Sequence, residues 1–141
     1  MSITEMAIKP RPESDSGTSA KIIAYKNNKI LLLQNPANTW ELPGGHIKKT
    51  ESREEGARRE FKEETGLTVG VLTRLSTKVD RVIYKTNLAS INVKLSPEHK
   101  KFMFVAVNNL YKMNLSKKAY KDLLFLKPRP KKKDDDIQDI L

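Results

Sequence analysis

Three carboxylates lie within a stretch of five residues: Glu60, Glu63 and Glu64. On a helix, the spacing i, i+3 and i+4 places all three on one face. Like charges repel one another there, and near the C-terminal end of a helix the dipole also disfavours anions. Two explanations fit this cluster. It is either a solvated acidic surface or a site for a hard divalent ion such as Mg²⁺, which takes oxygen ligands.

A helix is predicted to carry these carboxylates, from about residue 51 to residue 65. Thr50 is the expected N-cap, and Gly66 stands where a left-handed C-cap would lie. Acidic residues in the first turns agree with the helix dipole. Gly44 and Gly45 precede the helix, so a loop of small residues is expected beside it.

The spacing over residues 45–67 resembles the Nudix box, Gly-x5-Glu-x7-Arg-Glu-U-x-Glu-Glu-x-Gly-U, in which U is apolar. All nine specified positions are met: Gly45, Glu51, Arg59, Glu60, Phe61, Glu63, Glu64, Gly66 and Leu67. The preceding residues WELPGG also resemble the family's usual lead-in. This resemblance to the Nudix hydrolases implies an α/β fold, an α/β/α sandwich whose mixed β-sheet carries the box as a loop-helix-loop.

The resemblance implies a metal-dependent pyrophosphohydrolase with Mg²⁺ or Mn²⁺ as cofactor. Its substrate would be a nucleoside diphosphate linked to another moiety, cleaved at the diphosphate linkage. The implied metal ligands are Gly45, through its carbonyl, and Glu60, Glu63 and Glu64. Arg59 would orient the carboxylates through charge-assisted hydrogen bonds. Glu51 and Gly66 are expected to have supporting, structural roles.

The base that activates water is expected to be Glu60, with Glu98, outside the box, as the alternative. His46 follows the glycines directly and either contacts phosphate or has no role. Tyr84 lies seventeen residues after Leu67. This is similar to the tyrosine placement in dinucleoside polyphosphate hydrolases, although core packing explains Tyr84 as well. No proline falls about sixteen residues beyond the box, where the ADP-ribose group usually has one. A dinucleoside polyphosphate or nucleotide sugar is therefore slightly favoured over ADP-ribose.

The chain of 141 residues has a net charge of +10 and no cysteine. Disulfides, thiolate metal sites and a cysteine nucleophile are therefore excluded. Residues 68–121 carry eleven Lys or Arg against two acids. Such a basic region suits a polyphosphate or nucleic acid, or only keeps the protein soluble. An RNA 5′-end pyrophosphohydrolase and a non-catalytic nucleotide- or RNA-binding module therefore stay open, although the intact box glutamates favour an enzyme.

One domain is expected at residues 18–126, between a flexible leader at 1–17 and a charged, disordered tail at 127–141. The tetrapeptide Lys-Pro-Arg-Pro occurs in both flanks, as a linker or as a docking peptide. No apolar run reaches the length of a membrane span, and the first residues lack the apolar core of a signal peptide. We therefore expect a cytoplasmic protein without membrane contact. The family resemblance adds a homodimer as an option.

Further elements follow from apolar periodicity and turn residues. A hairpin is predicted from residues 21–25 and 29–34, followed by a short extended segment at 40–42. After the box helix, strands are predicted at 67–75, 81–85, 89–95 and 101–107. The last of these is continuously apolar, which predicts burial on both faces. A second helix is expected at 115–126.

Overall fold

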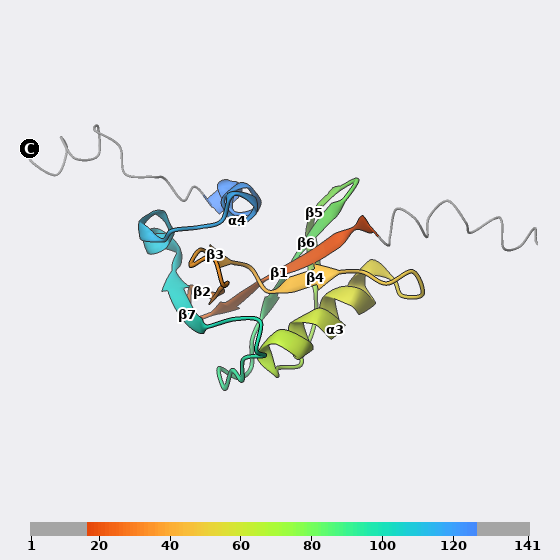
Figure 1. Cartoon of the computed structure of the whole chain (residues 1–141), viewed down its shortest axis with the longest axis horizontal. Helices are drawn as coiled ribbons and strands as arrows, with labels where there is room; N and C mark the ends of the chain where they lie inside the picture. Colours follow the sequence, from red (N-terminus) through yellow and green to blue (C-terminus); the bar gives the residue numbers. More distant parts are fainter. Residues whose placement is uncertain (1–16, 127–141) are drawn as a thin grey trace, which may run out of the picture.

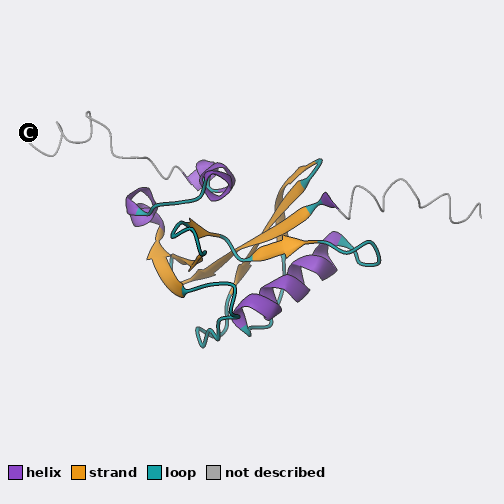
Figure 2. Ribbon diagram, viewed as in Figure 1, coloured by secondary structure: helices purple, strands orange, loops and turns teal. Residues whose placement is uncertain are grey.

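A mixed β-sheet runs through the structure, a computed structural model that describes residues 17–126. The sheet has seven strands, with α3 on one face and the C-terminal helices on the other (Figure 1). Figure 2 shows the strands between these two helical layers. The strands are β1 (Ser19–Lys26), β2 (Lys29–Gln34), β3 (Trp40–Glu41), β4 (Gly44–His46), β5 (Thr73–Lys78), β6 (Arg81–Asn87) and β7 (Lys101–Ala106). The helices are α3 (Arg53–Thr65), η1 (Val107–Lys112), α4 (Lys117–Asp122) and η2 (Leu124–Leu126). The predicted α/β/α arrangement is confirmed.

Strand β1 organises the sheet because it has neighbours along both edges. Strand β6 pairs with it in parallel over its whole length. On the other edge, β4 pairs with residues 19–21 of β1 and β2 with residues 25–26, both antiparallel. The predicted hairpin between β1 and β2 is confirmed, and Asn27 and Asn28 take positive φ angles of 52° and 65° in its turn. Beyond this short pairing β1 and β2 separate, and β4 pairs with β1 and β3 with β2 instead.

Two apolar cores fill the space on either side of the sheet. Side chains alternate along β1, so that Ala20 and Ile22 lie on one face of the sheet and Ile23 lies on the other. The first core lies under α3, where Ala57 and Phe61 are fully buried. The second core lies under η1, α4 and η2. Each helical layer is therefore held to the sheet by burial of its apolar side.

Helix α3 begins two residues later than predicted, because Ser52 and not Thr50 is its N-cap. The Ser52 hydroxyl accepts a hydrogen bond from the Glu55 N–H at 3.0 Å, and the Glu55 carboxylate accepts one from the Ser52 N–H at 2.8 Å. This reciprocal capping box was visible in the sequence as Ser-x-x-Glu. The predicted C-cap is confirmed, since Gly66 has a φ of 75° and donates to the Lys62 carbonyl at 2.8 Å.

Ser52→Ala is expected to lower the free energy of unfolding by about 1 kcal/mol, because one N-terminal N–H of α3 loses its acceptor. Urea unfolding followed by circular dichroism measures this change. Ser90→Ala is the control, since among residues 17–126 the Ser90 hydroxyl makes a single, exposed hydrogen bond, which it accepts from the Asn92 N–H. Equal effects of the two substitutions would contradict a stabilising role of the capping box.

Several strand predictions were wrong in their limits or burial. Residues 67–72 form an extended loop in which Leu67 and Val69 are buried, and the following strand, β5, begins only at Thr73. The predicted strand at 89–95 is also a loop. An extended loop that packs on the core has the same apolar alternation as a strand, which explains both errors.

The prediction that the last strand is buried on both faces was wrong. Strand β7 pairs with β2 alone among the described strands, so it lies at an edge, and Phe102 and Met103 are 40% and 44% exposed. The second helix is shorter than predicted. Helix α4 has only six residues, because its C-cap, Leu123, leaves the helical conformation. The 3₁₀ turn η2 follows it.

The leader up to residue 16, the tail at 127–141 and with them both Lys-Pro-Arg-Pro copies lie outside the described residues. Within residues 17–126, no helix combines the length and the apolar character needed to cross a bilayer.

Candidate metal and substrate site

The glycine loop at β4 lies directly against the acidic face of α3. Gly44 has a φ of 138°, and a Cβ there would lie 2.0 Å from the Ala20 carbonyl oxygen. Its N–H donates to the Glu64 carboxylate at 2.9 Å. A Cβ on Gly45 would lie 2.5 Å from the Glu60 carboxyl carbon. Gly44 therefore lets the loop lie close to β1, where its N–H reaches Glu64. Gly45 lets the backbone approach the Glu60 carboxylate.

Arg59 bonds to three carboxylates of the box, those of Glu51, Glu60 and Glu63. Its guanidinium donates to Glu51 at 3.0 Å from Nε and 2.7 Å from Nη2, and to the His46 carbonyl at 3.1 Å. Nη1 reaches Glu60 at 3.2 Å and Glu63 at 3.1 Å. The hydrogen bonds that Arg59 donates to Glu51 raise the pKa of Arg59, so the guanidinium stays charged. Arg59 thereby offsets part of the repulsion between these carboxylates.

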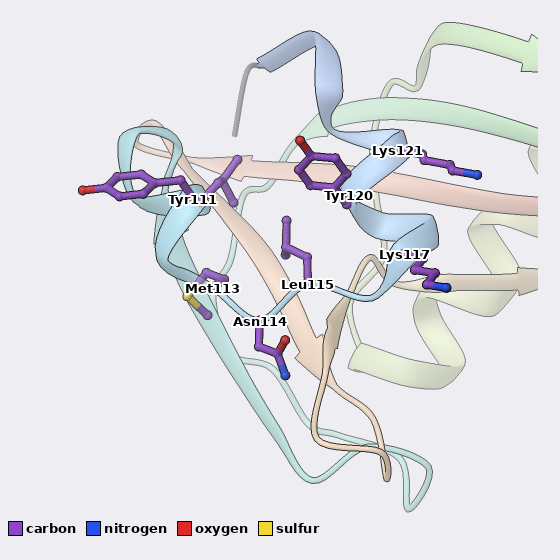
Figure 3. Close-up of a pocket in the computed structure, with 8 residues that line it drawn as sticks. Tyr111, Met113, Asn114, Leu115, Lys117, Tyr120 and Lys121 are labelled. Atoms are coloured by element: carbon purple, nitrogen blue, oxygen red, sulfur yellow. The ribbon is translucent and has the colours of Figure 1, made fainter. Parts of the chain in front are cut away.

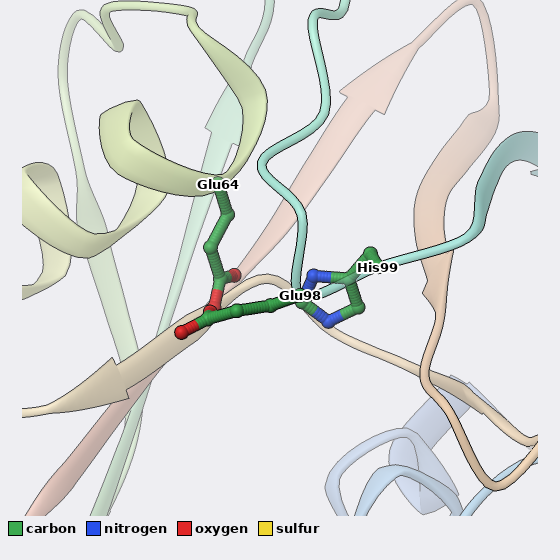
Figure 4. A group of neighbouring side chains, drawn as sticks. All are labelled: Glu64, Glu98 and His99. Atoms are coloured by element: carbon green, nitrogen blue, oxygen red, sulfur yellow. The ribbon is translucent and has the colours of Figure 1, made fainter.

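Glu64 is the buried carboxylate of the site, at 6% exposure. Burial raises its pKa to about 7, although the Gly44 N–H and the Lys21 charge oppose the shift. Glu98 and His99, from the loop before β7, approach it so closely that one ligand atom of each residue lies within 4.8 Å of the others (Figure 4). Glu64 and His99 are buried, whereas Glu98 is exposed.

The imidazole of His99 is positioned by a chain of hydrogen bonds through Glu41 and Asn35. Its Nε2 lies 2.8 Å from Oε2 of Glu41, and the Asn35 amide donates to the other oxygen of Glu41 at 2.9 Å. Burial lowers the pKa of His99, but the Glu41 hydrogen bond and the Glu64 charge outweigh it, so the pKa lies above its ordinary value. Sequence reasoning missed His99. The available signal was its place next to Glu98 as one of only two histidines.

This donor set suits a divalent cation. Opposite ligands of one ion lie twice the metal–ligand distance apart, about 4 to 5 Å for Mg²⁺ or Ca²⁺, which is close to the observed spacing. Glu64 is a buried acid with a raised pKa, so a nearby cation would favour its ionised form. Glu60 and Glu63 lie outside this closest group and bond to Arg59, with Glu63 on the exposed side.

A basic cleft of about 330 Å³ adjoins the other side of the glycine loop. Its cationic lining comes from three elements: Lys21 on β1, Arg81 on β6, and Lys117 and Lys118 on α4. Lys21 donates to the carbonyls of Leu42 and Gly44 at 3.2 Å each, and burial lowers its pKa. Gly45 and His46 complete this side, so the carboxylates and the cations meet at one loop.

An apolar pocket of similar volume lies beside this cleft, between η1 and α4 (Figure 3). Tyr120 points from α4 toward η1, whereas Tyr111 extends outward. Lys117 lines both the pocket and the cleft. The two hollows are therefore neighbours, one cationic and one largely apolar.

The two candidate substrate residues lie in different surroundings. His46 is exposed in the basic cleft, with Nδ1 3.4 Å from the Ser19 hydroxyl. Tyr84 is buried in the core under α3, where burial raises the pKa of its phenol. Core packing thus accounts for Tyr84 without a ligand.

Gly45→Ala is expected to lower kcat/KM by about a hundredfold while changing the free energy of unfolding by less than about 1 kcal/mol. The three atoms nearest to the new methyl group all belong to the Glu60 carboxylate, which is the end of a side chain, so the fold accommodates the methyl group by moving that carboxylate. Gly70→Ala is the control, since a Cβ there meets nothing within 4 Å. Steady-state kinetics and urea unfolding measure both quantities. Full activity of Gly45→Ala would show that the position of Glu60 is unimportant.

The chain is similar to known proteins of one family. A family model described as the NUDIX domain matches residues 16–124. An 8-oxo-dGTP diphosphatase of Proteus vulgaris is 34% identical over 64 residues, which cover 42% of this chain and 57% of that protein. An ADP-ribose pyrophosphatase of Methanocaldococcus jannaschii is 32% identical over 105 residues, which cover 64% of this chain and 62% of that protein. The chain thus spans less than two thirds of the length of these curated relatives.

The fold is shared with solved structures as well. A MutT NUDIX hydrolase from Burkholderia pseudomallei superposes with a TM-score of 0.66 at 21% identity, and the alignment covers 75% of this chain and 94% of that one.

Proposed function

Because the chain belongs to the NUDIX domain family, we propose that it is a metal-dependent hydrolase that cleaves the diphosphate linkage of a nucleoside diphosphate derivative. The observation that carries the proposal is the meeting of opposite charges at the glycine loop. Buried Glu64 and its neighbours lie on one side, and the Lys21, Arg81, Lys117 and Lys118 cleft lies on the other. A diphosphate bound across this loop would contact a cation site and basic side chains together.

The substrate is proposed to be a nucleoside diphosphate joined to a second moiety, such as a dinucleoside polyphosphate, a nucleotide sugar or ADP-ribose. The cationic cleft would take the phosphates, and the apolar pocket that shares Lys117 would take a base or sugar. The Methanocaldococcus jannaschii relative is an ADP-ribose pyrophosphatase, which supports this class. The Proteus vulgaris relative is an 8-oxo-dGTP diphosphatase, so a nucleoside triphosphate belongs among the substrates to be tested.

A bound Mg²⁺ or Mn²⁺ would neutralise phosphate charge and lower the pKa of an attacking water. Gly45, Glu60, Glu63 and Glu64 are the proposed metal ligands, with Glu98 beside Glu64. Arg59 holds Glu60 and Glu63 in place and keeps its positive charge throughout. Glu60 and Glu98 are the two candidates to accept the proton of the water as it attacks phosphorus.

The test is phosphate release from a panel of substrates, coupled to excess phosphatase or pyrophosphatase. The panel holds ADP-ribose, diadenosine polyphosphates, nucleotide sugars, 8-oxo-dGTP, unmodified nucleoside triphosphates and 5′-triphosphorylated RNA, each with Mg²⁺, with Mn²⁺ and with EDTA. Turnover of one class that EDTA abolishes would support the proposal and identify the substrate. Binding of nucleotide or RNA without any turnover would instead indicate a non-catalytic module.

Divalent ions are expected to raise the melting temperature of the protein, because a cation that binds only the folded state stabilises it. At 100 times its Kd, the ion adds about 2.7 kcal/mol to the free energy of unfolding. Differential scanning fluorimetry with MgCl₂ or MnCl₂ against EDTA measures the shift. KCl at the same ionic strength is the control, since chloride is already the anion of both metal salts. An unchanged melting temperature at millimolar Mg²⁺ and Mn²⁺ would count against a metal site.

A further inference from the structure

Only one of the two imidazole nitrogens of His99 has a hydrogen-bond partner among the described residues. Its side chain is 4% exposed, and Nε2 lies 2.8 Å from the Glu41 carboxylate. The buried Nδ1 has no hydrogen-bond partner among the described residues. A buried polar nitrogen without a partner is uncommon in folded proteins and calls for an explanation. Figure 4 shows the ring beside the carboxylates of Glu64 and Glu98.

The hydrogen bond to Glu41 fixes which nitrogen carries the proton. An ionised carboxylate only accepts hydrogen bonds, so Nε2–H donates to Glu41, and a neutral ring then has its lone pair on Nδ1. Glu41 is itself held by the Asn35 amide at 2.9 Å. Metal-binding histidines usually have this arrangement, in which the outer nitrogen donates to a carboxylate and the inner one binds the ion.

We propose that Nδ1 of His99 is a metal ligand beside Glu64 and Glu98, that Glu41 positions the ring through Nε2, and that this nitrogen shifts the preference of the site from Mg²⁺ toward Mn²⁺. The inference rests on the proposed function, since it concerns the cation that this function requires. Mg²⁺ prefers oxygen ligands, whereas imidazole suits transition metal ions. The observed spacing of ligand atoms, within 4.8 Å, allows the three side chains to share one ion after a small adjustment.

The decisive measurement is electron spin echo envelope modulation on the full chain loaded with one equivalent of Mn²⁺. A directly bound imidazole nitrogen gives a characteristic ¹⁴N modulation, which requires neither substrate nor turnover. We expect this modulation in the wild-type protein and in His46→Gln, which changes the other histidine of the chain. It should disappear in His99→Gln.

Calorimetric titration with Mn²⁺ and with Mg²⁺ measures the affinity of the site for each ion. His99→Gln should weaken Mn²⁺ binding at least about tenfold and Mg²⁺ binding less. Glu41→Gln keeps the imidazole, so the ¹⁴N modulation should persist while Mn²⁺ binding weakens about tenfold. This second variant tests the arrangement even if His99→Gln proves unstable.

The outcomes separate this inference from the proposed function. Bound Mn²⁺ without ¹⁴N modulation, or with modulation retained in His99→Gln, overturns the His99 assignment and leaves the hydrolase proposal standing. Failure of Mn²⁺ to bind at all overturns both. Modulation that depends on His99, together with silence across the substrate panel, would support the metal centre and count against hydrolysis.

Discussion

Glu64→Gln is expected to lower kcat/KM about a thousandfold, a loss of about 4 kcal/mol of transition-state stabilisation. The substitution removes the negative charge of the one box carboxylate that is buried against Glu98 and His99. The shape of the side chain is kept, and the amide oxygen still accepts the Gly44 N–H that Glu64 accepts at 2.9 Å. The melting temperature in EDTA should therefore not fall. Steady-state kinetics on the substrate found by the panel measure the loss.

Glu54→Gln is the matched control for this experiment. Glu54 lies on the same helix, and its carboxylate bonds to Arg58 on the exposed face. It should have wild-type kinetics. Retained activity in Glu64→Gln would refute the role assigned to Glu64. A large fall in melting temperature without metal would instead mean that the charge is needed for folding and not for the reaction.

Asp122→Ala is expected to lower the free energy of unfolding by about 3 kcal/mol, because it leaves a mostly buried guanidinium without its partner. Arg81 donates to Asp122 at 2.8 Å from Nε and 2.6 Å from Nη2. The side chains are only 16% and 6% exposed, and the pair joins β6 to α4. The melting temperature should fall by roughly 10 °C. Thermal and urea unfolding measure both changes.

The same Glu54→Gln variant is the control for burial. The Glu54 and Arg58 side chains are 51% and 37% exposed, and such surface pairs contribute at most about 1 kcal/mol. In the double variant Arg81→Met with Asp122→Leu, neither charge remains, so much of the loss should be recovered. Equal effects of Asp122→Ala and Glu54→Gln would show that burial adds nothing to the Arg81–Asp122 pair.

The features that the sequence predicted well are local ones. The β1–β2 hairpin depends on Asn27 and Asn28, which tolerate the positive φ angles of its turn. The end of α3 depends on Gly66, which takes a left-handed conformation. The placement of Glu60 and Glu64 on one helical face follows from helix geometry alone. Even the error in the N-cap was local, since the capping-box pattern of Ser52 and Glu55 indicates the true start of the helix.

The features that it predicted poorly depend on neighbours distant in the chain. Whether residues 67–72 and 89–95 form strands is decided by the presence of a pairing strand, which apolar alternation does not encode. The exposure of β7 follows from its position at the edge of the sheet. The hydrogen bonds from the Lys21 ammonium group to the Leu42 and Gly44 carbonyls likewise join residues that are 21 and 23 positions apart.

The sequence by itself determined the helix that carries the box carboxylates, the glycine loop before it and the family to which they belong. Only the tertiary structure brought Glu41, Glu64 and His99 together, because these residues lie on β3, on α3 and before β7. The physical reason is the distance along the chain over which each kind of interaction acts. Capping and turn preferences act over a few residues, whereas contacts between distant residues are set by strand order and by the packing of α3 on the sheet.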